Sequence, residues 1–193
     1  MRSEQTNPVS VKEQLILAGL REIESRGLTD LSLRRIASSC GLSCAAPYKH
    51  FADKHDFILA IIDYVNQEWL QRSYQVEKKF AGDSRRQLVE LSMEYIYFLL
   101  ENPHFRSILM LRDDSLDEEQ TRRKTEVSAT TKRIISRYCA EAGLSKEAEI
   151  RKTFVVRSLV YGASLMLDNG QLPKEESSFR FIAETIDREF ELP

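Results

Sequence analysis

The sequence predicts an all-α protein. The 193 residues include only seven Gly and five Pro, and most of these stand between apolar-rich segments, as expected for long helices joined by short turns. No sustained alternation of apolar and polar residues bounded by hairpin turns is present. Three apolar-rich segments are instead preceded by a capping-box pattern, a Ser followed three residues later by Glu or Gln. These are Ser10 with Glu13, Ser84 with Gln87 and Ser115 with Glu118.

The order of the helices follows from apolar spacing and stop signals. Phe57, Ile61, Val65 and Trp69 recur every four positions and form one face of a helix, and glycines such as Gly143 are typical helix stops. We expect nine helices, near residues 10–26, 32–39, 43–50, 53–80, 84–101, 103–111, 115–141, 146–170 and 174–191.

Helix length changes along the chain and suggests two domains. The first three predicted helices are short and the later ones are long, with no flexible linker between them. We therefore expect a small module at 1–52 and a larger helical body at 53–193, joined by the fourth helix.

Composition restricts the class of protein. The 28 basic and 30 acidic residues nearly balance, but residues 1–55 hold eight Lys or Arg against six Asp or Glu, which fits nucleic-acid contact confined to the N-terminal module. Three cysteines do not make a disulfide framework. The polar N-terminus does not resemble a signal peptide, and no apolar run reaches the roughly 18 residues of a membrane span. We expect a soluble cytoplasmic protein that does not contact membranes.

Residues 32–51 have the pattern of a helix-turn-helix. Ile36 and Ala37 lie on the apolar face of a short helix, Gly41 ends it, Leu42 fills the corner and Ser43 caps the next helix. Two helices joined by three or four residues that include a glycine are typical of this motif. Its second helix enters the major groove of DNA.

The predicted second helix carries groups suited to DNA. Its first residues are small and permit close approach, the Tyr48 hydroxyl can reach a phosphate, and Lys49 and His50 can donate to the backbone. Lys54 lies in the first turn of the fourth helix, where the dipole also favours a phosphate. We expect DNA contacts from Ser32, Arg34, Ser43, Cys44, Ala45, Tyr48, Lys49, His50 and Lys54.

The stretch GLTDLSLRRIASSCGLSCAAPYKHFADKHDFI resembles the N-terminal DNA-binding region of the TetR family of bacterial transcriptional regulators. The similarity is carried by Ile36-Ala37, Gly41-Leu42-Ser43, Tyr48, His50-Phe51 and Lys54, and it covers about residues 10 to 60. The resemblance implies a nine-helix fold with a three-helix DNA-binding domain and a ligand-binding, dimerising body. It also implies a homodimer that binds a palindromic operator.

Pro47 departs from the family pattern, which commonly has an unrestricted apolar residue here. At the fourth position after the Ser43 cap, proline removes one backbone hydrogen bond and disfavours helical geometry at Ala46. We expect an irregular first turn and a retained helix.

Metal, redox and enzymatic alternatives have weaker support. Cys40 and Cys44 are four residues apart, but a zinc site needs four ligands and only His50 and His55 are near. We expect packing roles for these cysteines and for Cys139, with a thiol switch at Cys44 as the alternative. No catalytic set, metal cluster or phosphate loop is recognisable, so we expect no enzyme activity, metal or cofactor.

The body contains a candidate ligand pocket. Large, soft side chains in 93–111 suit either a core or a cavity wall. Arg157 and Tyr161 lie one turn apart, and Arg157 either pairs with an internal acid such as Glu94 or binds an anionic ligand. Lining residues are expected to include Tyr95, Phe98, Phe105, Met110, Arg157 and Tyr161.

The last two helices are the expected dimer interface, by resemblance to the family. Gly162 would let another helix approach closely, although packing within one chain would explain the apolar stripe of the last helix equally well. The expected interface residues are Gly162, Met166, Phe179, Ile182, Ile186 and Phe190.

The preferred function is a dimeric DNA-binding regulator, a repressor that a small molecule releases from its operator DNA. The effector is expected to be anionic or aromatic. The alternative is a regulator with the same DNA-binding module whose body recruits a protein partner and senses no small molecule.

Overall fold

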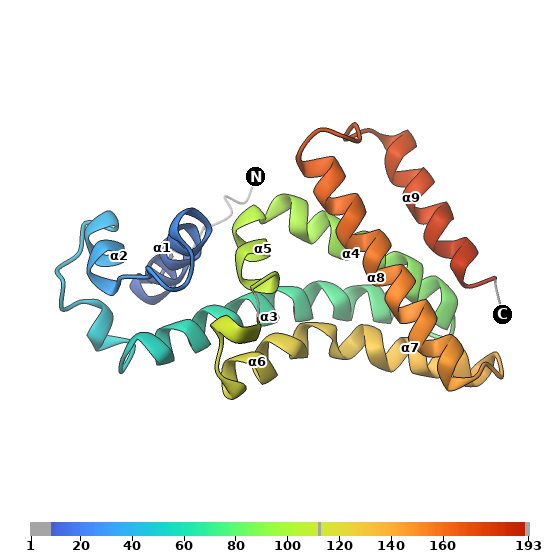
Figure 1. The fold of residues 1–193 in the computed structure, drawn as a ribbon, viewed down its shortest axis with the longest axis horizontal. Helices are drawn as coiled ribbons and strands as arrows, with labels where there is room; N and C mark the ends of the chain where they lie inside the picture. Colours follow the sequence, from blue (N-terminus) through green and yellow to red (C-terminus); the bar gives the residue numbers. More distant parts are fainter. Residues whose placement is uncertain (1–8, 112, 192–193) are drawn as a thin grey trace, which may run out of the picture. The chain divides into compact units, whose positions relative to one another are not determined.

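The structure, a computed structural model, describes residues 9–111 and 113–191 (Figure 1). Within these residues it contains no strand, and it has nine α-helices and three short 3₁₀-helices. The α-helices are α1 (Val11–Arg26), α2 (Leu33–Ser39), α3 (Lys54–Lys79), α4 (Ser84–Glu101), α5 (Pro103–Leu109), α6 (Glu118–Thr125), α7 (Ala129–Glu141), α8 (Lys146–Asp168) and α9 (Glu176–Glu189). The 3₁₀-helices are η1 (Pro47–Lys49), η2 (Asp113–Ser115) and η3 (Glu126–Ser128). The all-α prediction is confirmed.

The chain forms two compact units. The first unit comprises the chain up to Val65 together with His104–Lys124, and the second comprises Asn66–Pro103 and the chain from Thr125 onward. Helix α3 contributes its first half to the first unit and its second half to the second. The first unit thus contains residues 53–65 and most of α5 and α6 in addition to the expected module at 1–52.

In the first unit, α1 and α2 pack together and a small apolar core fills the space between them and the start of α3. Leu20, Ile36 and Phe57 are almost completely buried. The Phe51 and Phe57 rings meet edge to face with centroids 4.8 Å apart, so the residue after η1 anchors this segment to α3. Ser10 caps α1 by accepting from the Glu13 amide at 3.2 Å, as predicted.

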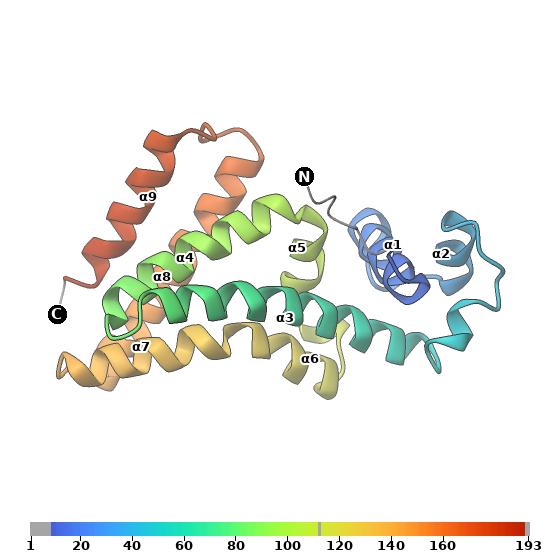
Figure 2. The same cartoon turned by 180° about the vertical axis from the view of Figure 1, so that it is seen from behind.

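In the second unit, α4 lies at the centre and packs against α7, α8 and α9 (Figures 1 and 2). Helices α8 and α9 also contact each other, and Figure 2 shows α9 folded back beside α8. Buried residues such as Leu91, Ile96 and Ile186 fill the interior. Arg85 of α4 binds Asp187 at 2.7 Å and Glu191 at 2.9 Å, which joins α4 to the end of α9.

The expected helix at 43–50 is not an α-helix. Only Pro47–Lys49 is helical, as one 3₁₀ turn, so the expectation that Pro47 would disturb only the first turn understates its effect. The Ser43 carbonyl accepts from the Ala46 amide at 2.9 Å, three residues on. Because proline has no N–H, the α-helical bond to that carbonyl from position 47 is impossible.

The single helix expected at 115–141 is also interrupted, since η3 separates α6 from α7. The Ser128 hydroxyl donates to the Thr125 carbonyl at 2.8 Å, a local bond of the kind that competes with helix geometry. The helix begins later than expected too, because Asp117 rather than Ser115 caps α6 by accepting from the Gln120 amide at 2.9 Å.

Among the described residues, no helix is long and apolar enough to cross a membrane. The same part of the chain holds no group of three or more His, Cys, Asp or Glu side chains arranged to bind a metal ion.

Candidate DNA-binding surface and ligand cavity

The turn between α2 and η1 has the geometry of a helix-turn-helix corner. Ser32 caps α2 by accepting from the Arg35 amide at 3.5 Å. After α2, Gly41 adopts φ +69°, a left-handed conformation that favours glycine. The Leu42 amide then returns to the Ala37 carbonyl at 2.9 Å. This closes α2 and turns the chain toward η1.

The segment after the turn exposes one set of side chains and buries another. Pro47 and Phe51 are buried, so they hold the segment on the first unit. The exposed residues are ones that were predicted from the sequence to contact DNA: Ser43, Cys44, Ala45, Tyr48, Lys49 and His50. The Tyr48 side chain is 55% exposed, which is high for an aromatic residue in a packed module. Together they offer the hydroxyls of Ser43 and Tyr48, the ammonium of Lys49 and the imidazole of His50, with small residues at the start of the surface.

Three other predicted DNA contacts flank this segment. Arg34 and Lys54 are exposed, whereas Ser32 is half-buried at its cap position. The Lys54 ammonium donates to the Thr29 carbonyl at 3.2 Å, which places it beside the loop that precedes α2. The neighbouring Arg35 is occupied within the protein, since it binds Glu22 at 2.7 Å and Asp30 at 3.3 Å.

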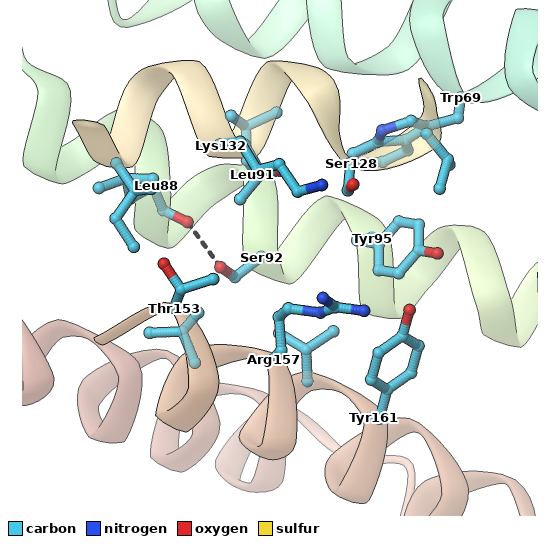
Figure 3. Close-up of a pocket in the computed structure, with 15 residues that line it drawn as sticks. Trp69, Leu88, Leu91, Ser92, Tyr95, Ser128, Lys132, Thr153, Arg157 and Tyr161 are labelled. Atoms are coloured by element: carbon cyan, nitrogen blue, oxygen red, sulfur yellow. Dashed lines mark hydrogen bonds between the residues drawn. The ribbon is translucent and has the colours of Figure 1, made fainter. Parts of the chain in front are cut away.

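The second unit contains a cavity of about 70 Å³ between α3, α4, η3, α7 and α8 (Figure 3). Its walls are apolar except for several hydroxyls and two cationic side chains. The lining residues are Trp69, Leu88, Leu91, Ser92, Tyr95, Val127, Ser128, Thr131, Lys132, Ile135, Thr153, Val156, Arg157, Val160 and Tyr161.

The cavity brings together three of the six residues expected to line a pocket, namely Tyr95, Arg157 and Tyr161. Phe98 instead lies in the core, where its ring is 5.5 Å from that of Trp69. Phe105 and Met110 belong to the first unit and do not line this cavity. Phe105 packs edge to face on Tyr64, and Met110 is 44% exposed.

Arg157 does not pair with Glu94. Glu94 binds Arg72 at 3.1 Å, and Arg72 also binds Glu101 at 2.6 Å. The Arg157 guanidinium instead lies 5.9 Å from the centre of the Tyr161 ring. Of the two roles that the sequence left open for Arg157, the internal ion pair with Glu94 is therefore not formed.

Several lining residues were missed by sequence reasoning. Trp69 is in the predicted apolar stripe of α3, which indicated a core position. Lys132 and Ser128 come from the segment where η3 meets α7, which the sequence presented as one continuous helix. The only available signal was the Thr-, Val- and Ser-rich run after residue 124, whose residues have low helix propensity.

Burial dominates the electrostatics of Tyr95. It raises the pKa of the Tyr95 hydroxyl well above its ordinary value; the nearby Tyr161 hydroxyl raises it further, and Arg157 opposes the shift. The hydroxyl therefore stays protonated and can serve as a hydrogen-bond donor toward the cavity.

The residues expected at a dimer interface divide into two groups. Ile182, Ile186 and Phe190 are buried within the second unit, and Phe179 packs on Tyr97 with ring centroids 4.9 Å apart. Packing within one chain thus accounts for the stripe of α9. Met166 is 42% exposed, and a Cβ added at Gly162 would meet nothing within 4 Å in this chain.

Other large apolar side chains, which sequence reasoning missed, are exposed on the last two helices. Phe154 is 70% exposed, Ile150 and Phe181 are each 63% exposed, and Leu165 is 50% exposed. Because Ile150, Phe154, Tyr161 and Leu165 recur at helical spacing, they lie along one side of α8.

Comparisons with known proteins match this arrangement. Residues 15–61 match the family described as bacterial regulatory proteins, tetR family. The chain is 22% identical over 192 residues to the uncharacterized HTH-type transcriptional regulator YerO of Bacillus subtilis (strain 168). That similarity covers 91% of this chain but only 63% of YerO, so the chain spans less than two thirds of its relative's length.

Solved structures share the fold over almost the whole chain. A TetR family transcription regulator from Marinobacter aquaeolei VT8 superimposes with a TM-score of 0.76 at 20% identity, over 92% of this chain and 94% of that one. Mycobacterium smegmatis AmtR gives 0.68 at 22% identity, over 100% and 89%. Residues 15–61 therefore carry the DNA-binding region described for the TetR family of bacterial regulatory proteins, and the chain has the all-helical fold of solved TetR family regulators.

Proposed function

We propose that the protein is a DNA-binding transcriptional regulator, a repressor that binds a palindromic operator as a homodimer and releases it when a small molecule occupies the body. The observation that carries the proposal is the exposed set from Ser43 to His50, held by buried Pro47 and Phe51 after a helix-turn-helix corner. YerO, the relative from Bacillus subtilis, bears the name of an HTH-type transcriptional regulator.

The chemistry of the surface suits a DNA backbone more than a detailed reading of bases. Tyr48, Lys49 and Lys54 can donate to phosphates, and such contacts fix the register of a protein on the duplex. The start of the segment offers Cys44 and Ala45, which have little hydrogen-bonding capacity. Base selection would therefore depend on few direct contacts and on the shape of the operator.

The exposed apolar side of α8, with Phe181 of α9, supports the homodimer. Monomeric proteins seldom expose several large apolar side chains together, and such patches mark interaction sites. Two copies that join through this surface could present two DNA-binding segments about 34–36 Å apart, one turn of the duplex. This matches the two-fold symmetry of a palindromic operator.

The cavity supports small-molecule control over the alternative of a body that only recruits a protein. Its wall includes η3, a short 3₁₀ segment between two α-helices, and such segments often mark functional hinges. A coupling of about 1–3 kcal/mol between cavity and operator would weaken DNA binding roughly 5–150-fold.

A gel-shift assay with the DNA upstream of the protein's own gene tests the DNA-binding function. The wild type should shift this DNA, and Tyr48→Ala with Lys49→Ala should abolish the shift. Lys49→Ala alone should weaken binding to all sequences and reduce the salt slope by about one. Lys78→Ala, an exposed lysine at the end of α3, is the matched control and should bind normally. Undiminished binding by the double variant would refute this placement of the interface.

Light scattering after size-exclusion chromatography tests the dimer. Phe154→Glu and Phe181→Glu put charges on the exposed surface of α8 and α9 and should give monomers. Tyr74→Glu, at a 59% exposed aromatic position on α3, should leave the dimer intact. A wild-type protein that is monomeric at micromolar concentration would contradict the proposal.

A further inference from the structure

The cavity has an excess of positive charge that no protein carboxylate balances. Its fifteen lining residues include Lys132 and Arg157 but no Asp or Glu. Within residues 9–111 and 113–191, neither of these two cations forms an ion pair with a carboxylate. Several other arginines of the second unit are paired: Arg72 with Glu94, Arg85 with Asp187 and Arg133 with Glu77. Lys132 and Arg157 are both exposed as well as lining the cavity, so they remain available to an anion that enters it.

One buried donor of the cavity wall, the Trp69 indole nitrogen, has no hydrogen-bond acceptor in the described structure. The buried Tyr95 hydroxyl has the Tyr161 hydroxyl near it. Trp69 is only 3% exposed, so water does not readily satisfy its N–H. A buried donor without a partner costs free energy, and buried polar groups in proteins are usually hydrogen-bonded. A ligand that brings an acceptor oxygen would remove this cost.

The aromatic residues of the cavity gather around these donors (Figure 3). The Trp69 and Tyr95 rings meet edge to face at 4.7 Å, and the Tyr95 and Tyr161 rings at 6.3 Å. Figure 3 shows the Arg157 side chain extending from α8 toward Tyr95, with the Tyr161 hydroxyl beside it. The donors of Arg157 and Tyr95 thus approach the same part of the cavity, next to ring surfaces.

The size of the cavity restricts the ligand. At about 70 Å³ it is far smaller than the roughly 300–1,000 Å³ of drug-sized sites. Since one water needs about 10–15 Å³ by the same measure, the space takes a compact molecule with only a few groups of that size.

We propose that the effector is a small aromatic carboxylate, whose carboxylate accepts from Arg157 and Tyr95 and is attracted by Lys132, while its ring packs against Trp69 and Tyr161. A planar guanidinium matches a carboxylate in two parallel hydrogen bonds, and edge-to-face contacts suit a ligand ring. The identification of this ligand as the effector rests on the proposed regulatory function; the anion site itself does not.

Trp69 provides the measurement, because it is the only tryptophan in the chain and it lines the cavity. Sodium benzoate is titrated into the full chain while Trp69 fluorescence is recorded, and calorimetry provides a second measure of affinity. Benzoate should saturate the signal. Benzyl alcohol, a neutral analogue, and benzylamine, a cationic one, should bind at least 10-fold more weakly.

Variants test whether the named residues cause the preference for an anionic ligand. Arg157→Met keeps the apolar stem and should weaken benzoate at least 10-fold, whereas Arg157→Lys should retain part of the affinity. Lys132→Met and Tyr95→Phe should each have a smaller effect, about 3–10-fold. Lys78→Met, which removes the same charge outside the cavity, should leave affinity unchanged. Circular dichroism and size-exclusion chromatography verify that each variant is folded.

Three results would overturn the proposal: no saturable benzoate binding up to about 10 mM, equal binding of benzyl alcohol, or full affinity in Arg157→Met. The gel shift of the unliganded protein separates this inference from the proposed function. If the operator DNA shifts but benzoate does not bind, only the ligand class is wrong. If benzoate binds but the protein shifts no DNA, the proposed anion site is supported and the proposed regulatory function is refuted.

Discussion

Gly19 of α1 contacts Phe57 of α3 so closely that no side chain fits between them. A Cβ built on Gly19 would lie 2.6 Å from Phe57 Cζ and 2.8 Å from Ile61 Cδ1. Phe57 and Ile61 are fully buried, so neither can move aside into solvent. Helix α1, which precedes the helix-turn-helix, therefore packs directly against α3, which follows it.

Gly19→Ala should destabilise the protein by up to about 2 kcal/mol. Overpacking a core costs about 1–3 kcal/mol, and the better helix propensity of alanine offsets only about 1 kcal/mol. Urea denaturation measures the change. In a Phe57→Leu background the same substitution should cost less, because the clashing ring is gone; equal costs in both backgrounds would show that Phe57 is not the obstacle.

Lys152 should be the most sensitive charged residue of the second unit. It is fully buried on α8, and its ammonium donates to the Glu189 carbonyl at 2.7 Å, at the last residue of α9. Lys152→Met keeps the length of the side chain but removes the charged donor, so unfolding free energy should fall by about 2–3 kcal/mol. Lys146→Met, at a 75% exposed position, should cost less than about 1 kcal/mol. Similar losses in both variants would contradict a special role for the buried ammonium.

Asp117, which caps α6, should make the free energy of unfolding depend on pH under acidic conditions. A backbone hydrogen bond from Gln120, with a further contribution from His55 at 2.8 Å, lowers the pKa of Asp117 from 3.8. Because the folded-state pKa is depressed, this contribution is fully present above 3.8 and is lost as the pH falls through the lower folded-state value. Asp117→Asn can still cap α6, but the asparagine side chain has no group that titrates in this pH range. The stability difference between wild type and Asp117→Asn should shrink below pH 3.8, and a constant difference would refute the assignment.

Local signals in the sequence predicted most helices within a few residues. Helix α4 occupies Ser84–Glu101 as expected at 84–101, although Asp83 rather than Ser84 caps it by accepting from the Arg86 amide at 2.9 Å, and α1 begins one residue after its expected start. Such helices depend on capping residues and on apolar spacing, and both signals can be recognised within a short stretch of consecutive residues. The DNA-binding segment was also recognisable, because the corner from Ile36 to Ser43 is a local motif.

What the sequence could not predict depends on contacts between distant residues. The stripe of Ile182 and Ile186 predicted an amphipathic helix, but spacing alone does not say whether the same chain or another covers it. The exposure of Phe154 could not be predicted for the same reason, since the adjacent Val155 and Val156 are half-buried or buried whereas Ile150, one turn away, is exposed. The cavity combines residues from α3 to α8, so only the packing of the second unit could reveal Trp69 and Lys132 as part of its wall.

Pro47→Ala should convert the segment after the corner from a 3₁₀ turn toward an α-helix. The substituted alanine supplies the missing N–H, which can donate to the Ser43 carbonyl, while Ala46 already has helical φ and ψ of −59° and −43°. The amide gained at position 47 should be protected from hydrogen exchange, as NMR can record. Overall stability should change by no more than about 1–2 kcal/mol, because only the buried ring contacts are lost. If the amide at this position exchanges at the rate of an unprotected peptide, something other than proline holds the 3₁₀ geometry.

The three cysteines should report on the DNA-binding surface through their accessibility. Cys44 is exposed, Cys40 is half-buried with its thiol 3.7 Å from the Gln14 carbonyl, and Cys139 is buried. Burial raises the pKa of the Cys139 thiol, and a thiol rather than a thiolate reacts slowly with alkylating reagents. Iodoacetamide should therefore label Cys44 first and Cys139 last, as mass spectrometry of the peptides would show. A saturating amount of DNA that gives a gel shift should slow labelling of Cys44 and leave Cys139 unaffected, because only Cys44 lies in the segment proposed to face the major groove. If Cys44 reacts equally fast with and without this DNA, the segment from Ser43 to His50 does not face the duplex, whatever the affinity of the protein for DNA.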